Sequence, residues 1–294
     1  RVYDRYVTKQ ISDESSTLGK WEATKEGLER VEIVFNEASG SGLQESMGVF
    51  WNAWQDLANN PSGRTERQML VGAGESLAYN FQQAYNDLGA VQEELDTNIS
   101  QAVSQINVKA KGVAELNQKI VQIETNGAHA NDYRDERDLL VKELSEMIDI
   151  TASEESNGTV TITLGDGESL VEGATFSELS TKDNDEGFSD VVWADDEETP
   201  INDDISGGKL KGWLDARDTT IDVYKTDLVE LVETITSEVN TLHEAGYGLY
   251  GEEDDPAEFT GNAFFAGTLD EKTFGVNLDI SGDINKIAAA SDAD

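Results

Sequence analysis

The strongest constraint on the fold is a run of apolar residues in the middle of the chain, spaced alternately three and four positions apart. We call it the first seam; it comprises Leu88, Val91, Leu95, Ile99, Ala102, Ile106, Val113, Leu116, Ile120 and Ile123, with Lys109 as the one polar gap-filler. This heptad spacing is typical of coiled coils and long bundle helices. It predicts one helix over residues 64–126, about 90 Å long at 1.5 Å per residue.

A second seam with the same spacing lies far away in the sequence. It comprises Leu210, Leu214, Arg217, Ile221, Tyr224, Leu228, Leu231, Ile235, Val239 and Leu242. Two such seams predict antiparallel helices packed side by side. Gly246 is expected to end the second helix, which places His243 in its last turn. There a histidine can bond terminal carbonyls and, when protonated, favours the negative helix end.

The spacing of apolar residues in the N-terminal part of the chain predicts two shorter helices. One helical face is expected to carry Tyr3, Tyr6, Leu18, Trp21, Leu28 and Phe35. A glycine-containing stretch over residues 36–42 interrupts this pattern. The next helix carries Phe50, Trp54 and Leu57 and ends before Pro61, because a proline pushes the preceding residue out of the helical region.

A further helix and a β-rich region follow the long helix. Asp132 is expected to cap a helix whose face is Leu139, Leu140, Leu144 and Met147. Between residues 159 and 173 Val160, Ile162 and Leu164 alternate with threonines beside the turn sequences SNG and GDG, and short apolar pieces separated by acidic turns follow, so residues 149–203 are expected to be β-rich. After residue 247 the chain is acidic and loop-rich, with one strand expected over residues 274–280 and a short helix over 284–290.

These patterns predict a mainly α fold with an inserted β-rich unit, namely an elongated bundle of long antiparallel helices plus a small β domain. The expected division places the first part of the helix bundle at 1–148, the β-rich domain at 149–203, the return helix at 204–246 and a loop-rich segment at 247–294. The sequence does not begin like a natural N-terminus, and we expect a trimmed fragment.

The charge of the chain limits the classes of molecule that can bind to it. Sixty acidic and 21 basic residues give a net charge of −39, which repels nucleic-acid phosphates and anionic lipids. No apolar run approaches the roughly 20 residues that span a bilayer. We therefore expect neither nucleic acid nor membrane as a partner. The absence of cysteine excludes disulfides, thiolate metal sites and cysteine nucleophiles.

Few residues are candidates for catalysis or metal binding. His243 beside Glu244 is not part of an H-E-x-x-H motif, because Tyr247 stands where the second histidine would be. The acidic stretches at 183–187 and 251–255 resemble only fragments of calcium loops. We therefore expect no catalytic residue, no metal site and no cofactor. The aromatic stretch at 49–54 favours core packing, with a partner-facing hot spot as the alternative.

Several blocks, taken in order, resemble the family of flagellar hook-associated protein 1. They are SGLQESMGVFWNAWQDLANNPSGRTERQMLVGAGESLAYNF, NDYRDERDLLVKELSEMIDI, GGKLKGWLDARD and VNTLHEAGYGLYG with the following GNAFF. The matching residues, to which the resemblance gives structural or packing roles, are Phe50, Trp54, Leu57, Pro61, Arg67, Asp132, Arg137, Asp138, Gly208, Leu210, Arg217, Asp218, Asn240, His243, Gly246, Phe264 and Phe265.

The resemblance implies a structural, non-enzymatic role at the junction of hook and filament. It implies export without a cleaved signal and location on the extracellular flagellum. The implied partners are the hook protein, the second hook-associated protein and copies of the same chain in a ring, with an export chaperone on a C-terminal segment outside residues 1–294. The alternatives are an acidic extracellular coiled-coil adhesin or stalk protein, and a hydrolase in the β-rich unit, for which no convergent site is indicated.

Overall fold

The computed structural model describes residues 5–35, 42–125, 127–251 and 255–291, and its description of side chains starts at Lys9. The chain divides into two compact units. Unit 1 combines residues 1–30 with 91–221, and unit 2 combines residues 31–90 with 222–294. These borders do not follow the four segments expected from the sequence, and that division stays a prediction.

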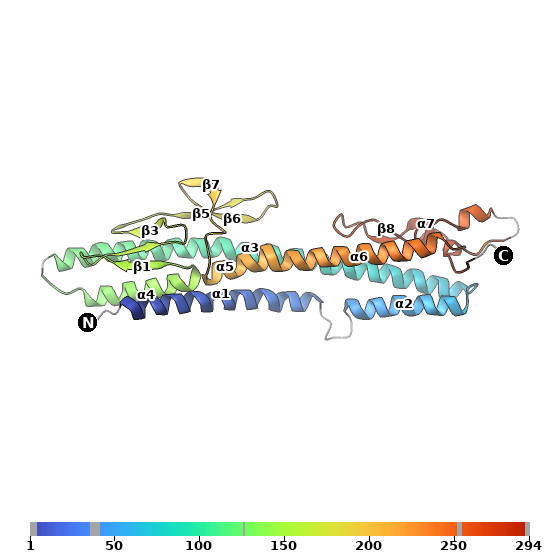
Figure 1. Cartoon of the computed structure of the whole chain (residues 1–294), viewed down its shortest axis with the longest axis horizontal. Helices are drawn as coiled ribbons and strands as arrows, with labels where there is room; N and C mark the ends of the chain where they lie inside the picture. Colours follow the sequence, from blue (N-terminus) through green and yellow to red (C-terminus); the bar gives the residue numbers. More distant parts are fainter. Residues whose placement is uncertain (1–4, 36–41, 126, 252–254, 292–294) are drawn as a thin grey trace. The chain divides into compact units, whose positions relative to one another are not determined.

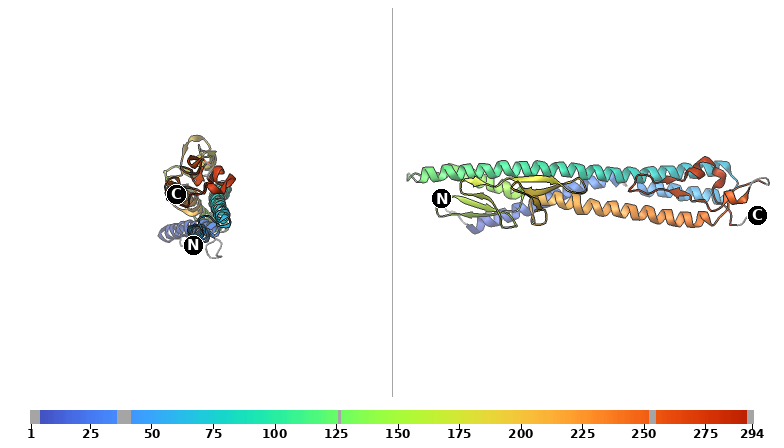
Figure 2. Two further views of the ribbon diagram at one scale, coloured as in Figure 1. Left: turned by 90° about the vertical axis from the view of Figure 1, so that its right-hand side faces the viewer. Right: turned by 90° about the horizontal axis from the view of Figure 1, so that it is seen from above.

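The long helix that the first seam predicts is present as α3, Arg64–Glu124, and it runs unbroken through 61 residues (Figure 2). Its first residues belong to unit 2 and those from Val91 onward to unit 1. Most of the seam is buried, including Leu95, Ile99 and Ile106, whereas Val91 near its start and Ile123 at its end are half-buried.

Unit 1 combines α3 with three more helices and two small antiparallel sheets. The helices are α1 (Arg5–Phe35, which extends into unit 2), α4 (Asn131–Met147) and α5 (Gly208–Asp215). The first sheet has the order β1 (Thr151–Glu154), β2 (Val160–Thr163), β3 (Ser169–Glu172) and β4 (Thr175–Phe176). The second has the order β5 (Leu179–Asp183), β6 (Ser189–Trp193) and β7 (Asp196–Pro200).

The β strands lie along α3 (Figure 1). Side chains of α3 fix them there: Asn107 donates to the Leu179 carbonyl at 2.7 Å, and Asn117 donates to the Val160 carbonyl at 2.8 Å. The expected turns at SNG and GDG are present, with Gly158 and Gly167 at φ of 86° and 88°, which glycine adopts without strain. Apolar residues of α3, α4, α5 and both sheets form one core.

The predicted apolar face of the first helix is wrong. Leu18, Trp21 and Leu28 are exposed, and Phe35 is only half-buried. Tyr3 and the side chain of Tyr6 lie outside the described residues. The buried face of α1 consists mainly of small residues: Ser12, Ser15, Ser16, Gly19, Ala23 and Gly27, followed by Val31.

Close backbone approach explains this choice of face. A Cβ on Gly19 would collide with the carbonyl oxygen of Glu146 in α4, and a Cβ on Gly212 of α5 would lie 2.7 Å from that of Ala23. Helices separated by so little space leave no room for leucine or tryptophan, so the larger side chains of α1 point elsewhere.

Unit 2 is built around α2 (Leu43–Asn59), the first part of α3 and α6 (Ile221–Glu244). Shorter elements complete it: the 3₁₀ helix Pro256–Phe259, β8 (Phe265–Ala266), β9 (Gly275–Val276), α7 (Leu278–Gly282) and the 3₁₀ helix Ile284–Lys286. α2 ends at Asn59, just before Pro61, as expected. The strands β8 and β9 pair with each other in antiparallel fashion.

The second seam is partly wrong. The return helix contains a π-helical turn, Ala216–Thr220, between α5 and α6. Tyr224, Leu231 and Leu242 are exposed, and Val232 and His243 are buried in place of the last two. The prediction of the buried positions failed at Leu231 because the neighbouring Val232 is also apolar and is the one that is buried. It failed at Leu242 because a polar residue, His243, occupies the last buried position.

The C-terminal elements differ from the expectation at two places. The strand expected over 274–280 is limited to β9, because the Asn277 side chain accepts a hydrogen bond from the Asp279 amide and caps α7. The helix expected over 284–290 is only the 3₁₀ turn Ile284–Lys286, because the backbone beyond it bonds to other segments: Ala289 donates to the Tyr247 carbonyl at 2.9 Å. Within the described residues, no helix is long and apolar enough to cross a membrane.

Candidate functional site

Five of the motif residues form an aromatic cluster in unit 2. Phe50 and Trp54 come from α2, His243 comes from the last turn of α6, and Phe264 precedes Phe265, the first residue of β8. Ring centroids lie 5.4 Å apart for Phe50 and Phe265, 5.4 Å for Trp54 and Phe264, and 6.2 Å for Trp54 and His243. The core packing expected for the stretch 49–54 holds only in part: Phe50 and Ala53 are buried and Trp54 is half-buried, whereas Val49 and Trp51 are exposed.

Asn240 fixes the backbone of this cluster. Its side-chain oxygen accepts from the amides of Phe264 and Phe265, both at 2.9 Å, and its side-chain nitrogen donates to the Phe265 carbonyl at 2.9 Å. Asn240 and His243 lie three residues apart and so share one face of α6. This geometry explains why asparagine and histidine occur at that spacing in the motif.

The structure corrects the role expected for His243. The ring does sit in the last turn of α6, but it is buried and bonds to other segments rather than to the helix end. Nδ1 contacts the Asn262 carbonyl at 2.5 Å, and Nε2 accepts from the Ala288 amide at 3.0 Å. A ring that donates through Nδ1 and accepts through Nε2 is neutral. Burial lowers the pKa of His243, which agrees with that state.

We expect the stability of unit 2 to fall as the pH falls below about 6.5, the ordinary pKa of histidine. Because the folded pKa of His243 is lowered, the unfolded chain binds more protons in this window. Stability that is fully present above the unfolded pKa is therefore lost as the pH falls toward the folded pKa. Urea unfolding between pH 7 and pH 5 measures the effect.

His129 provides the control, because the chain has only two histidines and His129 is exposed. The variant His129→Gln should keep the wild-type pH dependence, whereas His243→Gln should lose this part of it. An NMR titration of the wild-type imidazole reports the folded pKa directly. A folded pKa of His243 at or above 6.5 would contradict the assignment.

Arg67 is the most heavily bonded motif residue in unit 2. Its Nε and Nη2 donate to the Pro61 carbonyl at 3.0 and 2.7 Å, and its Nη1 donates to the Ile287 carbonyl at 2.7 Å. It therefore joins the start of α3 to the C-terminal segment. Pro61 fits this role because its carbonyl lies just after the end of α2.

Arg137 and Arg217 have the corresponding role in unit 1. Arg137 donates to the Gly158 carbonyl at 2.7 Å and to Asn117 at 3.1 Å, and its ion pair with the adjacent Asp138 is longer, at 3.9 Å. Both arginines are fully buried, and each ties a helix to the β region.

Arg217 lies in the π-helical turn and has the stronger charge pairing. It contacts Asp96 of α3 at 2.5 Å and Asp218 at 2.5 Å, and it donates to the Ser189 carbonyl of β6 at 2.9 Å. Asp96 also accepts from the Ser189 amide at 2.7 Å. These contacts join α3, the return helix and the second sheet.

The remaining motif residues serve packing and turns, with one exception. Leu57 and Leu210 are buried. Gly208 has φ of 76°, and a Cβ there would collide with the backbone of Ile148, so only glycine fits. Gly246 lies two residues beyond α6, as expected. The exception is Asp132: the N-cap of α4 is Ala130, without a side-chain cap, so the expected cap is wrong.

Sequence reasoning missed the polar partners on α3. Asn117 lies next to the first seam, is fully buried and bonds to Val160, Gly173 and Arg137. A polar residue next to an apolar seam was the available signal, but its partners lie in the β region and no spacing rule connects them.

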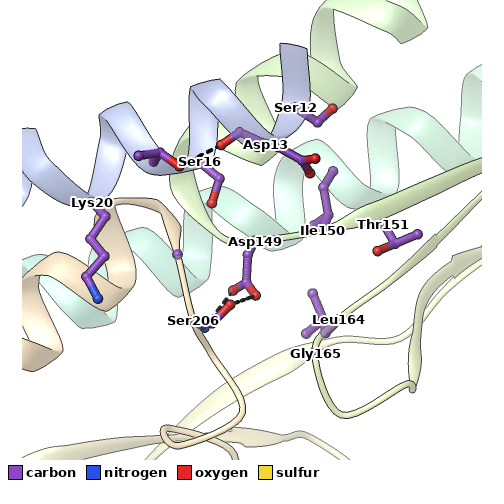
Figure 3. A pocket seen from close by; sticks show the side chains of 12 residues that line it. Ser12, Asp13, Ser16, Lys20, Asp149, Ile150, Thr151, Leu164, Gly165 and Ser206 are labelled. Atoms are coloured by element: carbon purple, nitrogen blue, oxygen red, sulfur yellow. Dashed lines mark hydrogen bonds between the residues drawn. The ribbon is translucent and has the colours of Figure 1, made fainter. Parts of the chain in front are cut away.

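A polar pocket in unit 1 is the other candidate site. It has a volume of about 310 Å³ and lies between α1 and the segments around Asp149, Gly165 and Ser206 (Figure 3). Asp149 accepts from the Ser206 amide at 3.0 Å and from its hydroxyl at 2.6 Å. Neither histidine lines the pocket. Among the described residues, no group of three or more histidine, aspartate or glutamate side chains is placed to hold a metal ion.

Comparisons with known proteins match this chain to one protein family. Residues 28–265 match the family described as the helical domain of flagellar hook-associated protein FlgK. Flagellar hook-associated protein 1 of Escherichia coli is 29% identical over 273 residues, covering 90% of this chain and 48% of that protein. Its namesake in Bacillus subtilis is 27% identical over 288 residues, covering 89% and 57%. The chain thus spans about half the length of these relatives.

A solved structure supports the fold. The flagellar hook junction protein FlgK from Burkholderia pseudomallei superposes with a TM-score of 0.74 at 22% sequence identity. The match covers 88% of this chain and 46% of that one. At this identity the likeness establishes the mainly α fold with a small β region, as the sequence predicts.

Proposed function

Because the chain belongs to the FlgK helical-domain family of flagellar hook-associated proteins, we propose that it is a structural component of the hook–filament junction. In this role it connects hook to filament and is required for filament assembly. The observation that carries the proposal is the family match over residues 28–265, which includes all of the motif residues described above.

The arrangement of the charged side chains supports a structural role. The three buried arginines and the buried histidine bond mainly to backbone carbonyls and amides or to fixed side chains, and each joins segments distant in sequence. Such contacts hold a framework in place. We therefore propose that the chain is not an enzyme, and that an acidic adhesin or stalk is the less favoured assignment.

The proposed partners are the hook protein, the second hook-associated protein and further copies of this chain in a ring. Export without a cleaved signal, location on the extracellular flagellum and a chaperone bound to a C-terminal segment beyond residue 294 complete the proposal. Deletion of the gene should leave hooks intact and remove attached filaments. Loss of the hooks themselves, or filaments of normal number, would argue against the junction role.

Part of the contact surface in the junction is proposed to lie on α1. Ile11, Leu18, Trp21 and Leu28 are exposed and spaced by seven, three and seven residues, so they share one helix face. We call this the α1 stripe. Apolar residues gathered on one exposed face commonly mark a contact surface.

The double variant Leu18→Gln with Trp21→Ala should remove most attached filaments from cells while leaving the fold intact. Trp21 is 64% exposed, so the free energy of unfolding should change by less than about 1 kcal/mol. Counting filaments by electron microscopy measures assembly, and thermal unfolding checks the fold. Val108→Gln is the matched control, since Val108 is also exposed but lies on α3. Equal filament numbers in the double variant and the wild type would refute the contact role of the stripe.

A further inference from the structure

A small apolar cavity in unit 2 is open to solvent beside the aromatic cluster. It has a volume of about 210 Å³ and is lined by Trp51, Trp54, Val239, Leu242, His243 and Ala288. Trp51 is 47% exposed and Leu242 is 75% exposed. A cavity of about 150 Å³ is known to accept a benzene molecule, so this one has room for a leucine or aromatic side chain.

One wall of the cavity is formed by Trp54, whose indole nitrogen lies below the accessible surface. The indole Nε1 of Trp54 is buried and has no acceptor among the described residues. Buried donors without partners are rare, because each one costs the free energy of its lost hydration.

The charges around the cavity indicate what kind of occupant it suits. α2 contains Glu45 and Asp56 and neither lysine nor arginine. Close to the cavity α6 carries Glu238 and Glu244, and the basic groups nearby are Lys286 and the buried Arg67, which donates to the Ile287 carbonyl. Charge complementarity favours a basic partner here. A second copy that presented the same acidic face would be repelled at this site.

We propose that this cavity, which we call the Trp51–Leu242 site, binds the apolar anchor of a basic amphipathic helix from another protein. The anchor is a leucine or aromatic side chain that enters between Trp51 and Leu242. Lysine or arginine residues on either side of it face the carboxylates of α2 and α6. This inference rests on the cavity and its charges, and it is independent of the role proposed for the α1 stripe.

The probe is a pair of synthetic peptides of about four helical turns built from alanine and lysine. One carries a central leucine anchor and the other has alanine at that position. Non-specific attraction to the acidic surface is the same for both peptides, so their affinity ratio isolates the anchor. Fluorescence anisotropy of labelled peptides measures this ratio for the chain and its variants.

The wild-type chain should bind the leucine peptide about tenfold more tightly than the alanine peptide. Leu242→Gln should abolish this preference, and Leu278→Gln should keep it, because Leu278 is 85% exposed but lies on α7 outside the site. Added salt should weaken the binding of both peptides and leave the ratio of their affinities nearly unchanged. Thermal unfolding of both variants verifies that the fold is intact.

Three results would overturn the proposal. One is equal binding of the two peptides by the wild-type chain, or no binding of either. Another is a leucine preference that Leu242→Gln retains. The third is a wild-type dimer in sedimentation that Leu242→Gln abolishes, which would make a second copy the occupant. None of these results bears on filament attachment, so failure here is distinguishable from failure of the junction role.

Discussion

Replacement of Leu228 by aspartate should destabilise unit 2 by about 4 kcal/mol. Leu228 is only 4% exposed on α6, and the substitution would place a carboxylate in an apolar core without a partner. Urea unfolding, followed by circular dichroism, measures the loss. The large expected effect comes from desolvation of a charge rather than from helix propensity.

Leu231→Asp is the matched control for this prediction. Leu231 lies on the same helix three residues away but is 38% exposed, so its aspartate would remain hydrated. The expected change is about 1 kcal/mol or less. Similar losses in the two variants would show that the buried face of α6 is not the one that contains Leu228, Val232, Ile235 and Val239.

Replacement of Arg217 by leucine should cost unit 1 about 3–5 kcal/mol, because it removes one partner of a buried ion pair. Asp96 would lose its contact at 2.5 Å, and the Ser189 carbonyl would lose a donor at 2.9 Å. The contacts of Arg217 with Asp96 and with the Ser189 carbonyl anchor the β region. Backbone amides of the β region should therefore exchange hydrogen faster in the variant than in the wild type. Hydrogen exchange and urea unfolding together measure the result.

Lys211→Leu tests whether burial is what makes Arg217 important. Lys211 pairs with Asp215 at 3.2 Å on the same return helix, but both side chains are partly exposed. Exposed pairs contribute about 0–1 kcal/mol, so this variant should unfold almost like the wild type. A comparable loss in both variants would mean that the buried pair has no special role.

Periodicity predicted the helices well and their buried faces less well. The end of α2 before Pro61 follows from a local backbone rule and the length of α3 follows from apolar spacing, whereas the interruption expected over residues 36–42 lies, apart from Gly42, outside the described residues. The buried face of α1 could not be predicted from hydrophobicity. Small residues occupy this face because α4 and α5 lie very close to α1. The distance between these helices is a property of the tertiary structure and cannot be read from the sequence of α1.

The motif residues could be selected from the sequence, but their contacts could not. Arg67 bonds to Ile287, which lies 220 positions further along the chain, and Asn117 bonds to Val160 across the fold. No spacing rule reaches over such distances. His243 illustrates the consequence: its position at the helix end was predictable, whereas its two bonds depend on where Asn262 and Ala288 return.

The interleaving of the two units has a consequence for the order in which the chain can fold during synthesis. Residues 31–90 belong to unit 2, but the rest of that unit begins only at residue 222. A ribosome must therefore complete residues 91–221, which belong to unit 1, before Phe50 and Arg67 can meet Phe265 and Ile287. Contacts that must wait for distant partners form slowly and leave apolar surface uncovered meanwhile. Unit 2 of the nascent chain is therefore expected to stay incompletely folded until the residues that follow 222 have been made.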